Sequence, residues 1–314
     1  MPGAAFNKEA NKVMTGRHSK WLPLLFVGPA LFILVVFLVY PTLQTIYFSF
    51  TKGTMLNPGR EFVGLANFER LLTADKTFLR LNQWPPSGVL PNTALWVLVF
   101  PSLTVGIGLL IAILSDRVRY EATIKSIVFL PMVISSTAAS VIFIFVYSPD
   151  LTKGILNAAM TSVLPQLDPI TWLGRKELAN IAIILAATWI SAGLPTVVLS
   201  AAYKGLPREI LEAAKVDGGN AWQVFWRVSL PMMKRPLTFV TIMLTINTLK
   251  MVDLILVMTE GGPRGATRVI GFTVWLEIFG NNRVGYGSAV AVILFILVTP
   301  AIIYQIRQVR GSLS

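Results

Sequence analysis

Residues 89–115 read VLPNTALWVLVFPSLTVGIGLLIAILS, and they lie within a longer stretch, 81–115, that contains no Asp, Glu, Lys or Arg. A helix that crosses the hydrocarbon core of a bilayer needs about 20 mostly apolar residues. The stretch meets this requirement without bringing a charged side chain into lipid, where charges are costly. It therefore predicts a transmembrane helix over 89–115, and the rest of the chain repeats the pattern.

The pattern occurs five more times. Four further stretches lack Asp, Glu, Lys and Arg, namely 21–50, 126–149, 178–203 and 284–306, while residues 236–259 carry only Lys250 and Asp253. The sequence thus predicts an all-α membrane protein with six transmembrane helices, at 22–48, 89–115, 126–148, 178–203, 236–259 and 285–306. Residues 154–167 are also uncharged but too few to span, so we expect an interfacial helix or a loop there.

The composition and the placement of charge support this prediction. Of the 314 residues, 54% are hydrophobic and 13% are charged, whereas soluble proteins carry about 25% charged residues. The net charge of +12 would suggest nucleic acid as a partner of a soluble protein. With the N-terminus inside, however, 15 of the 27 basic residues fall in four short segments, 1–20, 116–125, 204–235 and 307–314. The positive-inside rule therefore predicts cytoplasmic termini, and we expect the bilayer, not nucleic acid, as the partner.

Most catalytic chemistry is missing from the chain. Cysteine is absent and histidine occurs once, as His18, so neither a disulfide framework nor a transition-metal cluster is available. The phosphate-binding pattern G-x-x-x-x-G-K-[ST] is absent, because the dipeptide Gly-Lys does not occur. We expect no enzymatic activity, no cofactor and no metal site in this chain, and an energy source supplied by another subunit.

Lys250 and Asp253 are the only charged residues within a predicted span, and they stand three positions apart. On a continuous helix this spacing places both side chains on one face. Two interpretations follow. The two groups form an internal ion pair near the membrane boundary, or they line a polar path through the membrane.

The segment 204–236, KGLPREILEAAKVDGGNAWQVFWRVSLPMMKRP, is the longest predicted cytoplasmic loop after the first helix. Its residue pattern predicts two short helices. Pro207 suits the start of the first helix, and Gly218 is a typical residue at a helix end. Asn220 followed by Gln223 forms a capping-box pattern at the start of the second helix, which we expect to end at Pro231.

The same loop carries a spaced motif: Glu-Ala-Ala at 212–214, Gly218, then nine residues to Val-x-Leu-Pro at 228–231. This motif resembles the EAA loop of permease subunits of binding-protein-dependent ABC importers. The fuller form here, with Asp217 and Phe225, is similar to that of the carbohydrate branch, which includes maltose and glycerol-3-phosphate permeases. Val228 replaces the usual Ile.

Two other segments agree with the resemblance. Phe-Val-Gly-Leu-Ala-Asn-Phe at 62–68 resembles the first external loop of the family, where it serves either as a scaffold or as a docking surface for the binding protein. Thr-Glu-Gly-Gly-Pro at 259–263 resembles the segment that leaves the fifth core helix, and its two glycines and proline suit a sharp turn. The three motifs extend the resemblance over roughly residues 20–307.

The resemblance implies the type I ABC importer permease fold. It divides the chain into a cytoplasmic N-terminal segment, 1–20, a six-span permease domain, 21–308, and a cytoplasmic tail, 309–314. The loop 204–236 would contain the coupling helix, which docks in a cleft of the cytoplasmic ATPase. The residues implied in ATPase coupling are Glu212, as the charged contact, Ala213 and Ala214, as small packing residues, and Asp217 and Gly218, at the exit of the coupling helix.

The resemblance also implies partners and a mechanism. The chain would pair with a second homologous permease, with two ATPase subunits that bind ATP and Mg, and with an external solute-binding protein that delivers a sugar or sugar derivative. ATP-driven closure of the ATPases would turn the cavity from inward- to outward-facing. The expected location is the bacterial plasma (inner) membrane, as a multi-pass protein.

A sugar path needs hydrogen-bonding groups, because hydroxyls cannot be left unpaired in a dry passage. In maltose-type permeases, the stretch that matches 193–196 and the one before Gly-Gly-Pro contribute to the substrate cavity. The candidate path residues here are Trp189, Gly193, Thr196, Asn247, Lys250 and Asp253. Small and polar residues also mediate helix packing in membranes, so packing is the alternative role for each of them.

Two other functions remain open. A glycerol-phosphate or polyol importer of the same family would use Lys250 for an anionic solute. An ion-coupled secondary transporter, a different class of protein, normally carries its own coupling acids, whereas Asp253 is the only candidate in this chain.

Overall fold

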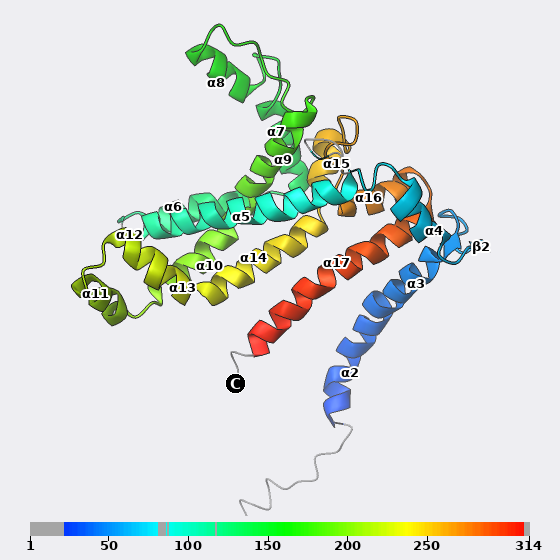
Figure 1. Cartoon of the computed structure of the whole chain (residues 1–314), viewed down its shortest axis with the longest axis horizontal. Helices are drawn as coiled ribbons and strands as arrows, with labels where there is room; N and C mark the ends of the chain where they lie inside the picture. The colour runs from blue at the N-terminus through cyan, green and yellow to red at the C-terminus, as the bar shows by residue number, and fades with distance from the viewer. Residues whose placement is uncertain (1–21, 81–85, 87, 117, 311–314) are drawn as a thin grey trace, which may run out of the picture.

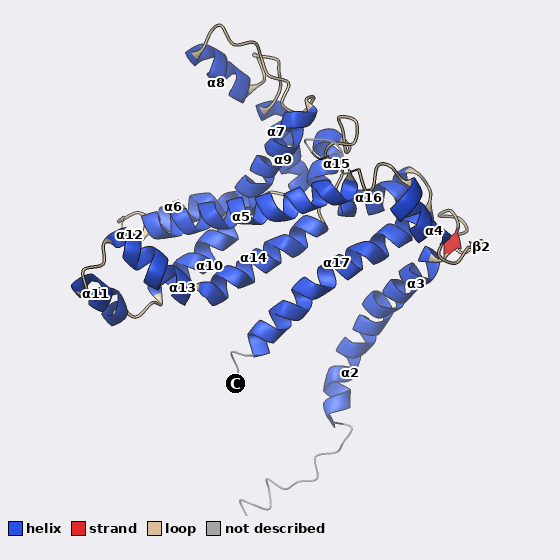
Figure 2. Cartoon of the chain, in the orientation of Figure 1, coloured by secondary structure: helices blue, strands red, loops and turns tan. Residues whose placement is uncertain are grey.

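The computed structural model describes residues 22–80, 86, 88–116 and 118–310, and the secondary structure of these residues is mostly helical (Figures 1 and 2). The predicted N-terminal segment 1–20 lies outside the described residues, as does most of the tail 309–314. Helices are the expected outcome for uncharged stretches of this length, because lipid offers no hydrogen bonds and each backbone N–H and C=O must find a partner within its own segment.

Three of the predicted spans are helices without a sharp bend. The first consists of α2 (Leu22–Leu34), the π-helical turn η1 (Val35–Val39) and α3 (Tyr40–Ser49). The second is α5 (Val89–Ser115), and the last is α17 (Val284–Arg310). Each is long and apolar enough to cross a membrane.

The other three predicted spans are bent helix pairs. The third position holds α6 (Glu121–Phe129), the 3₁₀ turn η3 (Leu130–Val133) and α7 (Ser136–Val146), with a bend of 101°. The fourth holds α9 (Lys176–Ser191) and α10 (Gly193–Lys204), bent by 53°. The fifth holds α14 (Lys234–Leu249) and α15 (Asp253–Thr259), bent by 49°.

Two of these bends have identifiable causes in the sequence. Pro131 stands in η3, and the Ser135 side chain caps the new helix by accepting a hydrogen bond from the Ala138 N–H at 3.2 Å. Pro195 stands in the first turn of α10, directly after the 53° bend. The fourth span is therefore interrupted at Ala192, between Ser191 and Gly193.

Short elements connect the spans. They are β1 (Thr51–Lys52), paired antiparallel with β2 (Glu61–Phe62), α4 (Ala66–Glu69), η2 (Arg70–Ala74), α8 (Ile155–Val163), α11 (Arg208–Val216), α12 (Ala221–Val224), η4 (Phe225–Ser229), α13 (Leu230–Met232), α16 (Ile270–Trp275) and η5 (Leu276–Gly280). Helix α8 occupies the segment where we expected an interfacial helix or a loop. Helix α16 lies in a segment for which the sequence predicted only a loop, and its side chains from Ile270 to Thr273 are buried.

The helix α5 is the centre of the packing, with α9, α10 and α14 against it (Figure 1). Helix α17 packs instead along α3. The contact between α5 and α10 is close because Gly108 faces Pro195: a Cβ added to Gly108 would lie 2.8 Å from the Pro195 Cβ. A small residue at a helix crossing lets two backbones approach and gain dispersion contacts, which are a main source of helix association in lipid.

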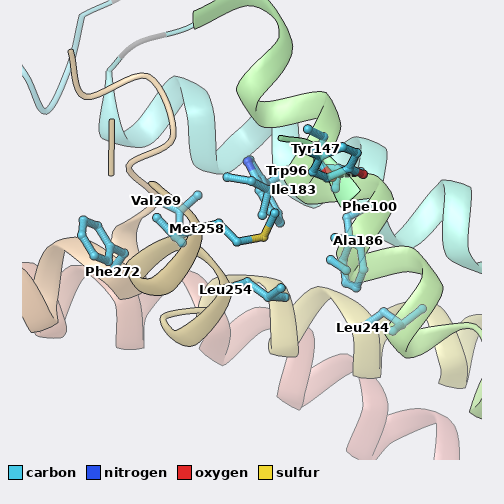
Figure 3. Close-up of a cluster of buried hydrophobic side chains, with 14 of the residues drawn as sticks. Trp96, Phe100, Tyr147, Ile183, Ala186, Leu244, Leu254, Met258, Val269 and Phe272 are labelled. Atoms are coloured by element: carbon cyan, nitrogen blue, oxygen red, sulfur yellow. Dashed lines mark hydrogen bonds between the residues drawn. The ribbon is translucent and has the colours of Figure 1, made fainter. Parts of the chain in front are cut away.

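A cluster of buried apolar side chains joins five helices (Figure 3). It includes Trp96 and Phe100 of α5, Ile183 and Ala186 of α9, Leu244 of α14, Leu254 and Met258 of α15, and Phe272 of α16. Because α15 and α16 follow the break in the fifth span, this cluster fixes the direction in which the chain continues after the break.

We expect the substitution Gly108→Ala to destabilise the bundle by about 1–3 kcal/mol, since its methyl group forces α5 and α10 apart. Gly106→Ala on the same helix is the control, because a Cβ there meets nothing within 4 Å and gains helix propensity. Melting temperatures of the two purified variants test this. Equal melting temperatures would show that the close approach of α5 and α10 contributes nothing to stability.

Candidate functional site

The hairpin of α11 and α12 is the first candidate site, and its local structure follows from its sequence. Pro207 is the N-cap of α11, and Gly218 has a left-handed φ of +86° just beyond the end of that helix. The Asn220 side chain accepts a hydrogen bond from the Gln223 N–H, and the Gln223 side chain accepts one from the Asn220 N–H, both at 2.9 Å. The two predicted helices and the capping box are confirmed.

One detail of that prediction is wrong. Pro231 does not end the second helix, because the chain passes from α12 through the π-helical turn η4 into α13, where Pro231 is the second residue. A proline is tolerated in the first turn of a helix, where its missing N–H has no intrahelical partner to lose. The backbone stays right-handed helical from α12 through η4 into α13, so the helical run ends at Met232, one residue after Pro231.

The α11 helix projects away from the bundle (Figure 1), and most of its surface is exposed. Glu212, Ala213, Asp217 and Gly218 are exposed, and Ala214 is half-buried. Val216, the last residue of α11, is 87% exposed. An exposed helix with small residues, an apolar side chain and two carboxylates is a surface suited to a protein partner.

Ion pairs hold the base of this hairpin to the start of α6. The Lys204 Nζ lies 2.6 Å from Glu121 Oε2 and 3.7 Å from Asp116 Oδ1. Hydrogen bonds from Lys125 and Lys204 hold the pKa of the Glu121 carboxyl below its usual range, and the hydrogen bond to Glu121 raises the pKa of Lys204. At neutral pH these groups are charged. Their ion pairs therefore fix the end of α10, from which the chain continues into the hairpin.

The candidate path residues differ in burial, and two of them are packed inside the helix bundle. Gly193 and Thr196 are buried; a Cβ on Gly193 would lie 2.7 Å from the Phe129 Cα, and the Thr196 hydroxyl donates to the Ala192 carbonyl at 2.8 Å. These contacts favour helix packing as the role of the two residues. Trp189 is 42% exposed and meets the Phe143 ring edge-on at 5.4 Å.

Three other candidate path residues are exposed. Asn247, Lys250 and Asp253 lie at the junction of α14 and α15, and all three are exposed. Because the helix breaks between Leu249 and Asp253, Lys250 and Asp253 do not share a helical face, and no Lys250–Asp253 ion pair within 4.0 Å is present in the described part of the chain. The internal ion pair, one of the two interpretations, is therefore wrong. Their role as a polar path lining remains a prediction.

The turn after α15 is as sharp as its glycines suggest. Gly261 has a φ of +80°, and the peptide bond between Gly262 and Pro263 is cis. The Thr267 hydroxyl donates to the Gly262 carbonyl at 2.8 Å and lies 2.8 Å from the Thr259 hydroxyl. The predicted turn is confirmed, and Thr267 closes it.

A buried polar network that the sequence analysis did not identify anchors the loop after this turn. Asn180 of α9 donates to the Ala266 carbonyl at 2.8 Å and to Asn92 Oδ1 at 2.9 Å, and it accepts from the Trp96 indole at 2.9 Å. Asn92 donates to the Arg268 carbonyl at 2.9 Å. The sequence offered one signal for this network, an asparagine in each of two apolar spans. A buried amide in a membrane helix needs hydrogen-bond partners, so such an asparagine predicts a polar contact.

The 62–68 motif has a scaffold role. The Asn67 side chain donates to the carbonyls of Ser49 and Thr51, at 2.9 and 2.8 Å, and thereby ties the loop to the end of α3. Phe68 packs against Phe50 with ring centroids 5.7 Å apart. Of the two interpretations of this motif, the scaffold is supported by these contacts.

The family described as "binding-protein-dependent transport system inner membrane component" matches residues 104–309. The osmoprotective compounds uptake permease protein GgtC of Synechocystis sp. is 41% identical over 92% of this chain and 99% of its own. The alpha-glucoside transport system permease protein AglF of Rhizobium meliloti is 34% identical over 91% and 82%.

A solved structure has the same fold. It is the crystal structure of a bacterial alginate ABC transporter in complex with an alginate pentasaccharide-bound periplasmic protein, and one of its chains aligns with a TM-score of 0.75 and 19% identity. The alignment covers 91% of this chain and 92% of that one. At this identity the match establishes the fold and leaves the solute undecided.

We expect Asn180→Leu to destabilise the protein by about 3 kcal/mol or more, because the Trp96 indole, Asn92 Oδ1 and the Ala266 carbonyl all lose a buried partner. Asn247→Leu, the same change at an exposed position, should leave the melting temperature unchanged. Thermal unfolding of both variants tests this. If the two variants melt together, the network does not stabilise the loop after Gly-Gly-Pro.

Proposed function

The chain belongs to the family of binding-protein-dependent transport system inner membrane components, and from this premise we propose that it forms one half of the solute passage of an ATP-driven sugar importer in the bacterial plasma membrane. The chain is a permease component, a class of protein that moves solutes and does not itself perform a chemical reaction. The exposed α11 helix is the single observation that carries the rest of the proposal.

The proposed topology has six spans with both termini in the cytoplasm. Three unbent helices and three bent pairs supply six crossings, if each pair counts once. This arrangement places the α11–α12 hairpin on the cytoplasmic side, together with the basic residues of the segment 204–235. The Gly-Gly-Pro turn and the hairpin of β1 and β2 then lie on the external side.

The energy source is proposed to be a pair of ATPase subunits, because the sequence lacks a phosphate-binding loop of its own. Each of the two ATPase subunits would bind one coupling helix, this chain providing one of them. Here Glu212 supplies a charge, and Ala213 and Ala214 allow close approach. Asp217 and Gly218 direct the chain out of the contact, and Gly218 can do so because of its positive φ.

A second, homologous permease is proposed to complete the passage. The exposed residues Asn247, Lys250 and Asp253 would then face a shared cavity and not lipid, where an exposed charge is costly. Movement of the two coupling helices would be transmitted through α10 and the ion pairs of Lys204 to the rest of the bundle. Alternating access follows as the cavity opens to one side at a time.

The solute is proposed to be a sugar or sugar derivative that an external binding protein delivers. AglF is named for alpha-glucosides and the aligned solved structure is of an alginate importer, so both names fit this class. An anionic sugar derivative is the second candidate, and the observation that favours it is the exposed Lys250, which has no carboxylate within 4.0 Å among the described residues.

We expect Glu212→Ala to weaken assembly with the ATPase by roughly 30-fold or more, because it removes one partner of an interfacial charge contact. The control is Glu209→Ala, an exposed acid in the first turn of the same helix, whose loss acts only on the helix dipole. Pull-down affinity and solute-stimulated ATP hydrolysis of the reconstituted complex measure both. An unimpaired Glu212→Ala complex would refute the coupling role.

The substitution Lys250→Gln distinguishes the two solute classes. With an anionic solute, we expect the KM for transport to rise roughly tenfold, because a charge-assisted contact becomes neutral. With a neutral sugar the KM should stay within about twofold. Uptake of both kinds of solute into proteoliposomes that contain the complete transporter is the measurement. A lower maximal rate with unchanged KM for both solutes would argue against Lys250 as a path residue.

A further inference from the structure

A basic pocket lies beyond the end of α3, beside the 62–68 motif. It measures about 640 Å³ and is formed by the β1–β2 hairpin, the loop with α4 and η2, and the start of α17. Its charged lining consists of four cations, Lys52, Arg60, Arg70 and Arg283, and one acid, Glu61. The lining therefore carries a net charge of +3.

Most of this charge is not neutralised within the chain. Arg283 pairs with Glu277 at 3.1 Å. For Lys52, Arg60 and Arg70, the described residues provide no carboxylate within 4.0 Å. Three cations that share one pocket repel one another, so an anion that enters the pocket is stabilised by all of them.

The pocket is held in shape by its own contacts. The guanidinium carbons of Arg70 and Arg283 lie 5.3 and 5.9 Å from the centroid of the Tyr286 ring, a cation–π arrangement that positions both side chains. The Met55 N–H donates to Asn282 Oδ1 at 2.8 Å, so the hairpin tip is fixed to the segment before α17. A preformed site loses less entropy when it binds its ligand.

Three exposed apolar residues stand within two positions in the sequence of residues that line the pocket. Leu56, at the tip of the hairpin, is 97% exposed, Phe62 of β2 is 70% exposed, and Leu65 is 66% exposed. These residues follow the end of α3 at Ser49 by only 7 to 16 positions. Apolar side chains this exposed are unfavourable in water, but they are favourable at the boundary between headgroups and acyl chains.

We propose that this pocket binds the phosphate group of an anionic membrane phospholipid, while Leu56 and Phe62 enter the acyl region beside it. Arginine guanidinium groups match phosphate oxygens in a bidentate geometry, which explains why two or three arginines are placed together. A basic pocket beneath an apolar tip, next to a spanning helix, is the charge pattern of a lipid-binding surface. The inference does not depend on the proposed solute.

The double variant Arg60→Gln/Arg70→Gln tests the pocket. Phosphatidylglycerol is added to the complete transporter complex in detergent, and bound lipid is counted by native mass spectrometry. We expect binding to weaken roughly 30-fold, from the loss of two surface charges. The control Arg175→Gln/Lys176→Gln removes two exposed cations elsewhere and should bind lipid as the wild type does. Arg60→Gln alone serves if the Arg70 change disturbs the fold.

The depth of the hairpin tip is a second test, and the absence of cysteine makes it direct. A fluorophore is attached to Leu56→Cys in proteoliposomes that contain lipids brominated along their acyl chains. We expect blue-shifted emission that these lipids quench, whereas a label on the exposed, charged position Lys153→Cys should emit as in water. Emission from Leu56→Cys as in water would overturn the membrane placement.

Two further outcomes would overturn the pocket assignment. If Arg60→Gln/Arg70→Gln binds phosphatidylglycerol normally but loses affinity for the loaded external binding protein, the pocket is a protein-docking surface. If inorganic phosphate at millimolar concentration displaces the lipid, the pocket recognises a free anion. Retention of lipid in the presence of inorganic phosphate, together with loss of lipid in the double variant, supports the proposal.

Discussion

The absence of hydrogen-bonding solvent in lipid is the constraint on which the rest of this structure depends. A continuous helix satisfies its own backbone groups, but three of the six predicted spans are broken, and each break needs local compensation. At the break before α7, Ser135 supplies it by accepting a hydrogen bond from the Ala138 N–H. Thr196 and Thr248 donate to the carbonyls four residues earlier, at Ala192 and Leu244, a type of bond that often accompanies a bend in a helix. The polar residues of these spans are therefore partly structural.

The breaks also determine where the chain presents its polar groups. Between α14 and α15, the bend exposes Lys250 and Asp253 and separates them, so neither neutralises the other. The buried amides of Asn92 and Asn180 then hold the returning loop against α5 and α9. A loop fixed by buried hydrogen bonds thus lies next to an exposed polar junction, which is the arrangement that the proposed solute cavity requires.

The opposite end of the bundle follows a different principle. The α11–α12 hairpin has a capping box at the start of α12 and exposed residues along α11, so local hydrogen bonds contribute to its stability. The hairpin follows α10, whose last residue, Lys204, forms the ion pairs described above. Helix α10 also crosses α5 closely, where Pro195 faces Gly108. In the proposed mechanism, a movement of the hairpin would therefore reach a closely packed crossing and be passed on to α5.

The sequence alone determined where the apolar helices lie, the two helices of the loop 204–236 with their capping box, and the turn at Gly-Gly-Pro. Each of these follows from local rules: hydropathy over 20 residues, the chemistry of caps, and the φ angles that glycine permits. Tertiary structure decided the rest. The partners of Asn180 lie 84 to 88 positions away in the sequence. Bends and crossings of the helices also decide three other features: the burial of Gly193, the separation of Lys250 from Asp253, and the position of two arginines over the Tyr286 ring. Such contacts join distant segments, and hydropathy and spacing describe only near neighbours.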